Sequence, residues 1–368
     1  MTYHLFHHNM ENYAGGPAPR QQLYQQAYAR TRAAATILTP PQILAAGFTE
    51  LRNWDRTMHS LDTALVGALD PGLRMLAVIA CGASALGNKE YLGIAIGRPG
   101  GAGTAFNVHS VGRVRFTVTG QQSRPIHDYF PPAPKDWTVI GPTAGLQQWG
   151  ASSGADSTPD YRYPVYVVGS IGPQTAVGAR VPRTTTLAKA ARPSTVIAVA
   201  WIHNRYKGSA DSSSARDSKA AAERLIAMQQ LPTVVKAIMS ENPFTPDYVF
   251  IGGDFNSPAN QEPGHQYIGT DRVARLRTFS ASAPPLLSPP GFFGPGSVLV
   301  PGGPATAQWK GGTTRGGNLY DYWFMGQGAT APPWPAGFPV PSACMAPVTA
   351  RGAPIELSDH AATFLEVL

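Results

Sequence analysis

Gly252-Gly253-Asp254-Phe255-Asn256 is the stretch that decides the fold predicted for this chain. It follows an apolar run at residues 248–251, and a β-branched and aromatic run closed by two glycines indicates a buried strand that stops abruptly. Glycines allow the backbone to turn sharply there. Because alternate residues of a strand share a face, Asp254 and Asn256 should point the same way, with Phe255 packed behind them. A polar turn after a core strand is the competing interpretation of so short a motif.

A second polar group stands before a later apolar stretch and weakens that competing interpretation. Ser358-Asp359-His360 precedes the apolar residues 361–367. With the two motifs in this order, the sequence resembles the endonuclease/exonuclease/phosphatase superfamily, which includes deoxyribonuclease I. The resemblance runs from about residue 3 to residue 368 of the sequence.

Other positions of the family pattern are found in the same order along the chain. Each stands at the end or the start of an apolar stretch that predicts a strand. Three of the stretches, residues 5–12, 43–51 and 196–204, carry the family residue toward their end. The other two, residues 88–96 and 320–324, carry it near their start. The five matching residues are Asn9, Glu50, His203, Glu90 and Asp321.

The family fold implied is an α/β protein, a four-layer α/β-sandwich of two packed mixed sheets flanked by helices. Helices are predicted at residues 20–38, 214–231 and 233–240, the first with apolar positions at Leu23, Ala27, Ala34 and Leu38. The chain is read as a single domain over residues 1–368, because 39 Gly and 35 Pro concentrate in long loops rather than in a linker. These loops are expected at residues 99–103, 121–164 and 280–317.

Two histidines are the proton-transfer groups that the resemblance implies. Each has a carboxylate to orient it, Glu90 for His203 and Asp321 for His360. Such a carboxylate selects one tautomer and raises the pKa of the imidazole. A histidine near a strand end is more often structural, so the pairing carries this prediction. Seven further histidines look unspecialised: His4, His7, His8, His59, His109, His127 and His265.

The remaining roles implied are water activation, phosphate binding and metal binding. Asp254 is expected to orient the attacking water and Asn256 to bind the phosphate. Glu50 is the expected principal ligand of Mg²⁺, or of Mn²⁺ or Ca²⁺, which prefer hard oxygen donors. The supporting metal ligands are Asn9, Glu11 and Asp359. Cys81 and Cys344 have no zinc-site spacing and are expected to be free buried thiols, although a disulfide between them is open.

The charge distribution favours a polyanionic substrate. The net charge is +7, and residues 161–210 hold seven basic residues and no acidic residue, as does the interior of 271–321 with five. Arg205 and Lys207, close to His203, are therefore expected to bind substrate. The predicted partner is nucleic acid, DNA rather than RNA, and a monomer is expected. A solvated basic surface without a partner is the alternative.

The first functional interpretation is thus a metal-dependent nuclease, and two others stay open. One is a sphingomyelinase-like or inositol-phosphate phosphoesterase of the same fold, and the other is a non-catalytic binding domain. No apolar run is long enough to span a membrane, and no signal peptide is evident. A cytoplasmic protein, one exported without a cleavable signal and one already trimmed all agree with this start.

Overall fold

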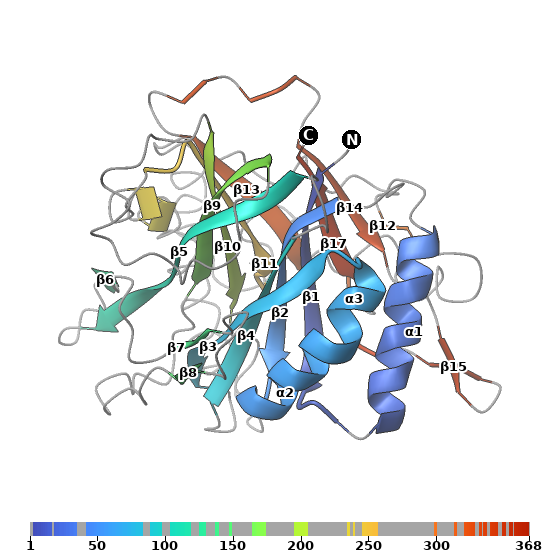
Figure 1. The fold of residues 1–368 in the computed structure, drawn as a ribbon. Helices are drawn as coiled ribbons and strands as arrows, with labels where there is room; N and C mark the ends of the chain where they lie inside the picture. Colours follow the sequence, from blue (N-terminus) through green and yellow to red (C-terminus); the bar gives the residue numbers. More distant parts are fainter. Residues whose placement is uncertain are drawn as a thin grey trace, which may run out of the picture.

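Two packed β-sheets form the body of the molecule (Figure 1). The structure is a computed structural model, and it describes residues 3–16, 18–34, 42–83, 89–97, 104–118, 125–129, 137–139, 147–148, 164–173, 195–204, 234–235, 238–239, 245–256, 298–299, 313–314, 320–327, 331–332, 334–336, 339–344, 348–350, 353–355 and 357–367. The helices predicted at 214–231 and most of the loops predicted at 99–103, 121–164 and 280–317 lie outside these residues, as do Arg205 and Lys207.

The first sheet has nine strands among the described residues, and the second has six. In order across the first sheet these are β12 (Val298–Leu299), β14 (Val340–Cys344), β17 (Ala362–Glu366), β1 (Tyr3–Tyr13), β2 (Gln42–Leu51), β4 (Lys89–Gly97), β3 (Leu73–Ala83), β7 (Trp137–Val139) and β8 (Gln147–Gln148). In order across the second they are β13 (Asp321–Gln327), β11 (Tyr248–Asp254), β10 (Val196–His203), β9 (Val165–Pro173), β5 (Thr104–Val118) and β6 (Pro125–Tyr129). A separate hairpin joins β15 (Val348–Ala350) to β16 (Ala353–Ile355).

Both sheets are mixed, as predicted. In the first sheet, β1 and β2 are parallel to each other, and each has an antiparallel neighbour on its other side. In the second sheet, β10 and β11 are arranged in the same way. All the strands expected from the family pattern are present. The loop expected at residues 121–164 differs in part, because the short strands β6, β7 and β8 extend the sheet edges there.

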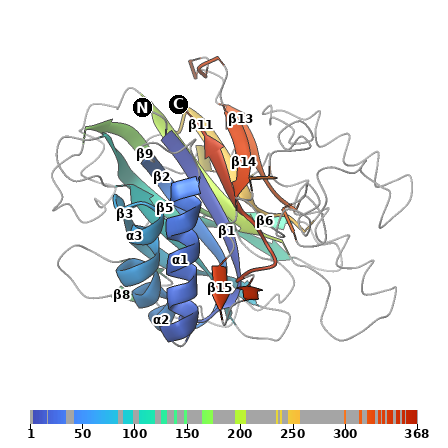
Figure 2. The same ribbon diagram turned by 90° about the vertical axis from the view of Figure 1, so that its right-hand side faces the viewer.

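Helices cover the outer face of the nine-stranded sheet (Figures 1 and 2). They are α1 (Ala18–Ala34), α2 (Trp54–Ser60), the π-helical stretch η2 (Leu61–Leu65) and α3 (Val66–Leu69). Of the apolar positions predicted on α1, Ala27 is buried, whereas the side chain of Ala34 and all of Leu38 lie outside the described part of the chain. Tyr24, Tyr28 and Thr31 are buried, whereas Leu23 is partly exposed. On the other sheet, residues 234–235 and 238–239 are helical, and Val234, Val235 and Ile238 are buried in the main core.

The core lies in two layers, one between the sheets and one between the first sheet and its helices. Strands β10 and β11 are buried at every position, which explains why their sequences are apolar runs rather than alternating ones. Trp201 joins the sheets: its indole N–H donates to the carbonyl of Phe6 at 3.0 Å, and its ring fills the space above Gly47. A Cβ on Gly47 would lie 2.4 Å from that ring, so this position requires glycine.

The two glycines of the deciding motif serve packing rather than a turn. Strand β11 continues through both of them to Asp254. A Cβ on Gly252 would lie 2.4 Å from Trp323, and one on Gly253 would lie 1.9 Å from the carbonyl oxygen of Ile202. Gly253 also has a φ of +145°, which side-chain-bearing residues rarely adopt. The abrupt strand end predicted at Gly-Gly is therefore wrong, and the turn follows Asp254 instead.

Two smaller predictions can also be judged. Cys81 is a buried thiol without a disulfide, as expected, and its Sγ–H donates to the carbonyl of Glu90 at 3.5 Å. None of the helices in the described part of the chain has the length and apolar content that crossing a membrane requires.

Candidate active site

The site lies where strand ends from both sheets meet. Parallel strands finish at one edge of a sheet, and their antiparallel neighbours begin there. Asn9 therefore lies in the last part of β1, just before the irregularity in its pairing with β2, and Glu50 lies next to the end of β2. His203 pairs with Asp254 at the ends of β10 and β11. Asp321 begins β13 directly opposite Asp254. The opposite edge holds the start of β1 and the end of β17, where the labelled chain ends lie side by side (Figure 1).

One carboxylate oxygen, Oδ2 of Asp254, is the centre of the site. It accepts hydrogen bonds from the side-chain amides of Asn9 at 3.0 Å and Asn256 at 3.1 Å. The Nε2 atoms of His203 and His360 lie 3.4 and 3.6 Å from the same oxygen. Asp254 is buried, so groups from four separate strand ends converge on an atom that bulk water barely reaches.

The two imidazoles have the carboxylate partners that the sequence predicted. Nδ1 of His203 is hydrogen-bonded to Oε1 of Glu90, and Nδ1 of His360 lies 2.7 Å from Oδ2 of Asp321. Both carboxylates are fully buried. Since both Nε2 atoms contact one Asp254 oxygen, they lie well within the about 10 Å beyond which a shared phosphate could not reach both.

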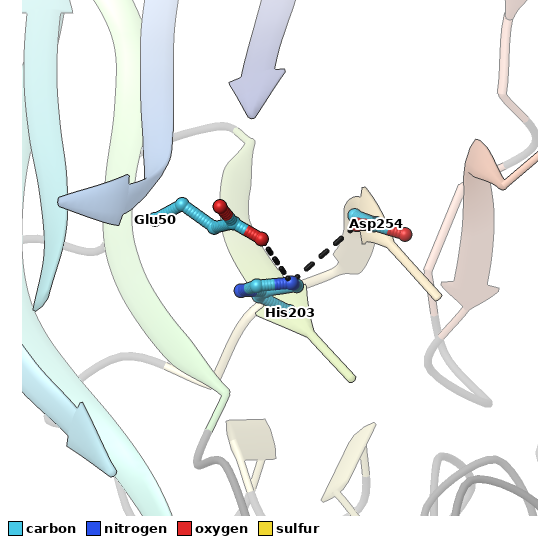
Figure 3. A group of neighbouring side chains, drawn as sticks. All are labelled: Glu50, His203 and Asp254. Carbon is cyan, nitrogen blue, oxygen red and sulfur yellow. Dashed lines mark ion pairs between the residues drawn. The ribbon is translucent and has the colours of Figure 1, made fainter. Parts of the chain in front are cut away.

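Glu50 faces the same group from the first sheet. Its Oε1 lies 3.1 Å from Nε2 of His203, and Figure 3 shows Glu50, His203 and Asp254 pointing toward one another. Its Oε2 accepts a hydrogen bond from the backbone N–H of Asn12 at 3.1 Å. Glu50 has a φ of 56°, and Asn256 has a φ of 49°. Non-glycine residues in this left-handed region carry strain, which concentrates at functional sites.

Asn256 follows Asp254 on the same side, as strand alternation predicted. Its backbone N–H donates to Oδ1 of Asp254 at 2.8 Å, and its amide nitrogen donates both to Asp254 and to the carbonyl of Asn204, at 2.7 Å. Phe255 packs behind, stacked on Tyr322 with ring centroids 4.3 Å apart. Both amide hydrogens of Asn256 are engaged, so contact with a substrate requires one of these bonds to be exchanged.

Two of the predicted site residues, Asp359 and Glu11, stand apart from this centre, and two others cannot be placed. Asp359 is beside His360, with Oδ1 3.7 Å from Nε2, but its side chain is 48% exposed. Glu11 donates its backbone N–H to Oδ1 of Asn9 at 3.0 Å. Neither acid belongs to the two clusters of close ligand atoms among the described residues. Arg205 and Lys207 lie outside the described residues.

Several supporting contacts were not predicted, although Ser358 belongs to a motif that the sequence did single out. His7 is buried with Nδ1 3.5 Å from Oδ1 of Asp321, although it looked unspecialised. Thr313 accepts the backbone N–H of Asp321 at 3.0 Å, and Ser358 donates to the carbonyl of Asn9 at 2.6 Å. These contacts join residues far apart in the chain, so local patterns do not reveal them. Strand alternation, which puts His7 and Asn9 on one face, was the available clue.

His360 is expected to stay protonated above neutral pH in metal-free protein. Burial lowers the pKa of its imidazole, but the carboxylates of Asp321 and Asp254 outweigh burial and raise that pKa well above its ordinary value. Protonated His360 therefore stabilises the fold fully below about pH 6.5, where an unfolded histidine titrates, and this contribution is lost as pH rises through the raised pKa. Asp321→Asn should lower the midpoint of an NMR titration of His360 recorded in EDTA; an unchanged midpoint contradicts the assignment.

The donor atoms of the site fit a divalent cation. Two clusters have all their ligand atoms within 4.8 Å of one another: Glu50, His203 and Asp254, and Asp254, Asp321 and His360. Four carboxyl groups crowd around two imidazoles when Glu90 is included, and this surplus of negative charge favours a cation. Their hard oxygen atoms suit Mg²⁺, Mn²⁺ or Ca²⁺.

Comparison with known proteins finds matches among solved structures but none by sequence. No family model matches the chain, and no curated protein matches its sequence. Among solved structures, sphingomyelinase C from Streptomyces griseocarneus is 14% identical, with 100% of each chain covered and a TM-score of 0.46. An endonuclease/exonuclease/phosphatase family protein from Bacteroides thetaiotaomicron is 12% identical, with 100% of this chain and 97% of that chain covered and a TM-score of 0.41.

A third match, beta toxin from Staphylococcus aureus with bound magnesium ions, is 11% identical, with 99% of each chain covered and a TM-score of 0.41. At these identities the likeness concerns the fold alone. The two packed mixed sheets described above are the architecture that the family resemblance of the sequence implied.

Proposed function

We propose that this protein is a divalent-metal-dependent phosphodiesterase that uses two histidines for proton transfer. The observation that carries the proposal is the convergence of His203 and His360 on one oxygen of Asp254, each imidazole being held by its own buried carboxylate. Two buried histidines that face one acidic centre with Nε2, while Nδ1 is held by a carboxylate, have the arrangement of an acid–base pair across a reacting group.

In this proposal the chain's own residues position the reactants and move protons. Asp254 orients the attacking water, whose oxygen forms the new bond to phosphorus as the bond to the leaving oxygen breaks. One imidazole accepts the proton that this water releases, and the other gives its Nε2 proton to the leaving oxygen. Glu90 and Asp321 hold the rings with Nε2 facing the reaction. Asn9, which gives one amide hydrogen to Asp254, has a second for a phosphoryl oxygen.

Glu50 and Asp254 would hold the cation, with Asn9, Glu11 and Asp359 as supporting ligands. Such a cation supplies positive charge that stabilises the phosphoryl oxygens in the transition state. The exposed fraction of the Glu50 side chain is 20%, against 1% for Asp254, so Glu50 is the ligand that faces the entrance.

Nucleic acid, and DNA before RNA, is the substrate class we propose. Residues 161–210 and the interior of 271–321 hold basic side chains and no acids, which suits a phosphate backbone. The deciding experiment offers the protein supercoiled plasmid, RNA and sphingomyelin, each with Mg²⁺ and with EDTA. Metal-dependent plasmid cleavage is expected. Preferential hydrolysis of sphingomyelin would instead support the lipid phosphoesterase, and binding without hydrolysis would support a non-catalytic domain.

The same substrate proposal predicts that binding weakens steeply with salt. Each phosphate contact contributes a log–log slope of about −0.9 on duplex DNA. Neutralising Arg205 and Lys207 should lower both the affinity and the slope, measured by fluorescence anisotropy with EDTA-treated protein. Arg30 and Arg74 are exposed basic residues on α1 and at the far end of β3, and their neutralisation is the matched control. A slope that does not distinguish the two pairs would remove Arg205 and Lys207 from the substrate site.

A further inference from the structure

His7 reaches the site from the interior of the molecule. On β1 the side chains of Leu5, His7 and Asn9 face the second sheet, whereas Phe6 and His8 face the helices. His7 has no solvent exposure. Its ring bridges two groups: Nε2 lies 3.1 Å from the hydroxyl oxygen of Thr49, and Nδ1 lies 3.5 Å from Oδ1 of Asp321.

The contact between His7 and Asp321 joins two unsatisfied atoms. Among the described residues, Nδ1 of His7 and Oδ1 of Asp321 both lack a hydrogen-bond partner, although both are buried. A buried polar atom without a partner is costly. Their separation of 3.5 Å exceeds a good N–H···O bond by only about 0.5 Å, and a small rotation of either side chain closes it. Each atom is therefore the natural partner of the other.

The tautomer of His7 follows from its acidic neighbour. A neutral ring with its proton on Nδ1 offers a donor to the carboxylate of Asp321, whereas the opposite tautomer would set a nitrogen lone pair against a carboxylate oxygen in a buried place. A hydroxyl can donate or accept, so Thr49 can donate to Nε2 of this tautomer.

We propose that His7 is a positioning residue, which holds Oδ1 of Asp321 so that Oδ2 stays on Nδ1 of His360. Both carboxylate oxygens of Asp321 then have a histidine partner, His7 at Oδ1 and His360 at Oδ2. Its backbone N–H donates to the hydroxyl oxygen of Thr313. Without His7 the carboxylate can rotate away from His360, and the imidazole loses the partner that keeps Nε2 toward Asp254. The effect on hydrolysis rests on the proposed phosphodiesterase function, whereas the effect on the Asp321–His360 pair does not.

The first test compares two substitutions that differ in one N–H group. His7→Asn places an amide nitrogen where Nδ1 stood, and His7→Leu fills similar volume without a donor. His7→Leu should lower kcat at least about tenfold, the size of one hydrogen bond to a charged group, with KM little changed. His7→Asn should recover most of that loss. His4→Leu, the control, removes a buried histidine at the opposite end of β1, where its ring packs on Phe364, and should leave kcat unchanged. Equal losses in His7→Asn and His7→Leu would mean that His7 serves packing alone.

The second test needs no substrate. The Nδ1 proton of His360, bonded to Asp321, should give a slowly exchanging low-field NMR signal in the intact protein. His7→Leu should speed its exchange with water about tenfold or more, and His7→Asn should restore it. If His7→Leu does not fold, His7→Gln, whose longer side chain carries its amide toward the position of Nε2 and away from Asp321, should give the same change. An unaltered His360 signal overturns the proposal, even in a protein that hydrolyses no phosphodiester.

Discussion

Replacing His203 or His360 by alanine is expected to slow phosphodiester hydrolysis by about 10²- to 10⁴-fold, the usual contribution of general acid–base catalysis. Each ring is fixed by its own buried carboxylate at Nδ1 and faces Asp254 with Nε2. Because each ring is held in its own place, neither can move to replace the other. The measurement is kcat on a plasmid or a chromogenic diester, with circular dichroism to establish that each variant folds.

The double variant adds a sharper criterion for the paired mechanism. Residues that act on one transition state are not additive, so the combined loss should be smaller than the product of the two single losses. Glu90→Gln should lose less than His203→Ala, because Glu90 acts through the ring it holds. Multiplicative losses would indicate that the two histidines serve separate steps or separate purposes.

Removing divalent cations is the second change with a large expected effect. Hydrolysis should stop in EDTA and return with Mg²⁺ or Mn²⁺. Glu50→Gln keeps the side-chain shape but removes the charge that faces the entrance, so we expect a loss of about 10² or more in rate. Calorimetric titration with Mg²⁺ should show weaker binding in this variant, independently of turnover.

The controls for the metal prediction separate Glu50 from its neighbours. Glu11→Gln and Asp359→Asn alter acids that lie outside the two ligand clusters of the described residues and should have smaller effects on Mg²⁺ affinity. Full turnover in EDTA would take the metal out of the mechanism. A Glu50→Gln enzyme with native rate and affinity would show that another carboxylate is the principal ligand.

The strands that carry the site were predictable because a strand buried on both faces is encoded by consecutive apolar residues. The apolar runs around 196–204 and 248–251 became β10 and β11, in which every side chain is buried. Polar residues that follow such runs stand out, and Asn9, Glu50, His203 and Asp254 are all of this kind. The helical stretch 54–69 gave no such signal. Asn53 begins it with a φ of 52° and no side-chain cap, and η2 departs from the helical period.

The contacts inside the site were less predictable, because they depend on how the two sheets are placed. The role of His7 depends on its contact with Asp321, which belongs to the other sheet and lies far along the chain. The Gly-Gly pair looks like a turn to any rule based on local conformation, whereas its cause is the bulk of Trp323 and the backbone of Ile202. Such steric demands are set by tertiary packing and leave no periodic trace.

The position of β1 between β2 and β17 has a consequence for biosynthesis. The ribosome makes β1 first and β17 last among the strands of the site, and Ser358 meets Asn9 across 349 residues of chain. A nascent chain therefore holds Asn9, Glu50, His203 and Asp254 while His360 is still untranslated or within the exit tunnel. The pair of imidazoles is complete only after the strand that follows His360 has emerged and paired, so the proposed phosphodiesterase should become fully active late in folding.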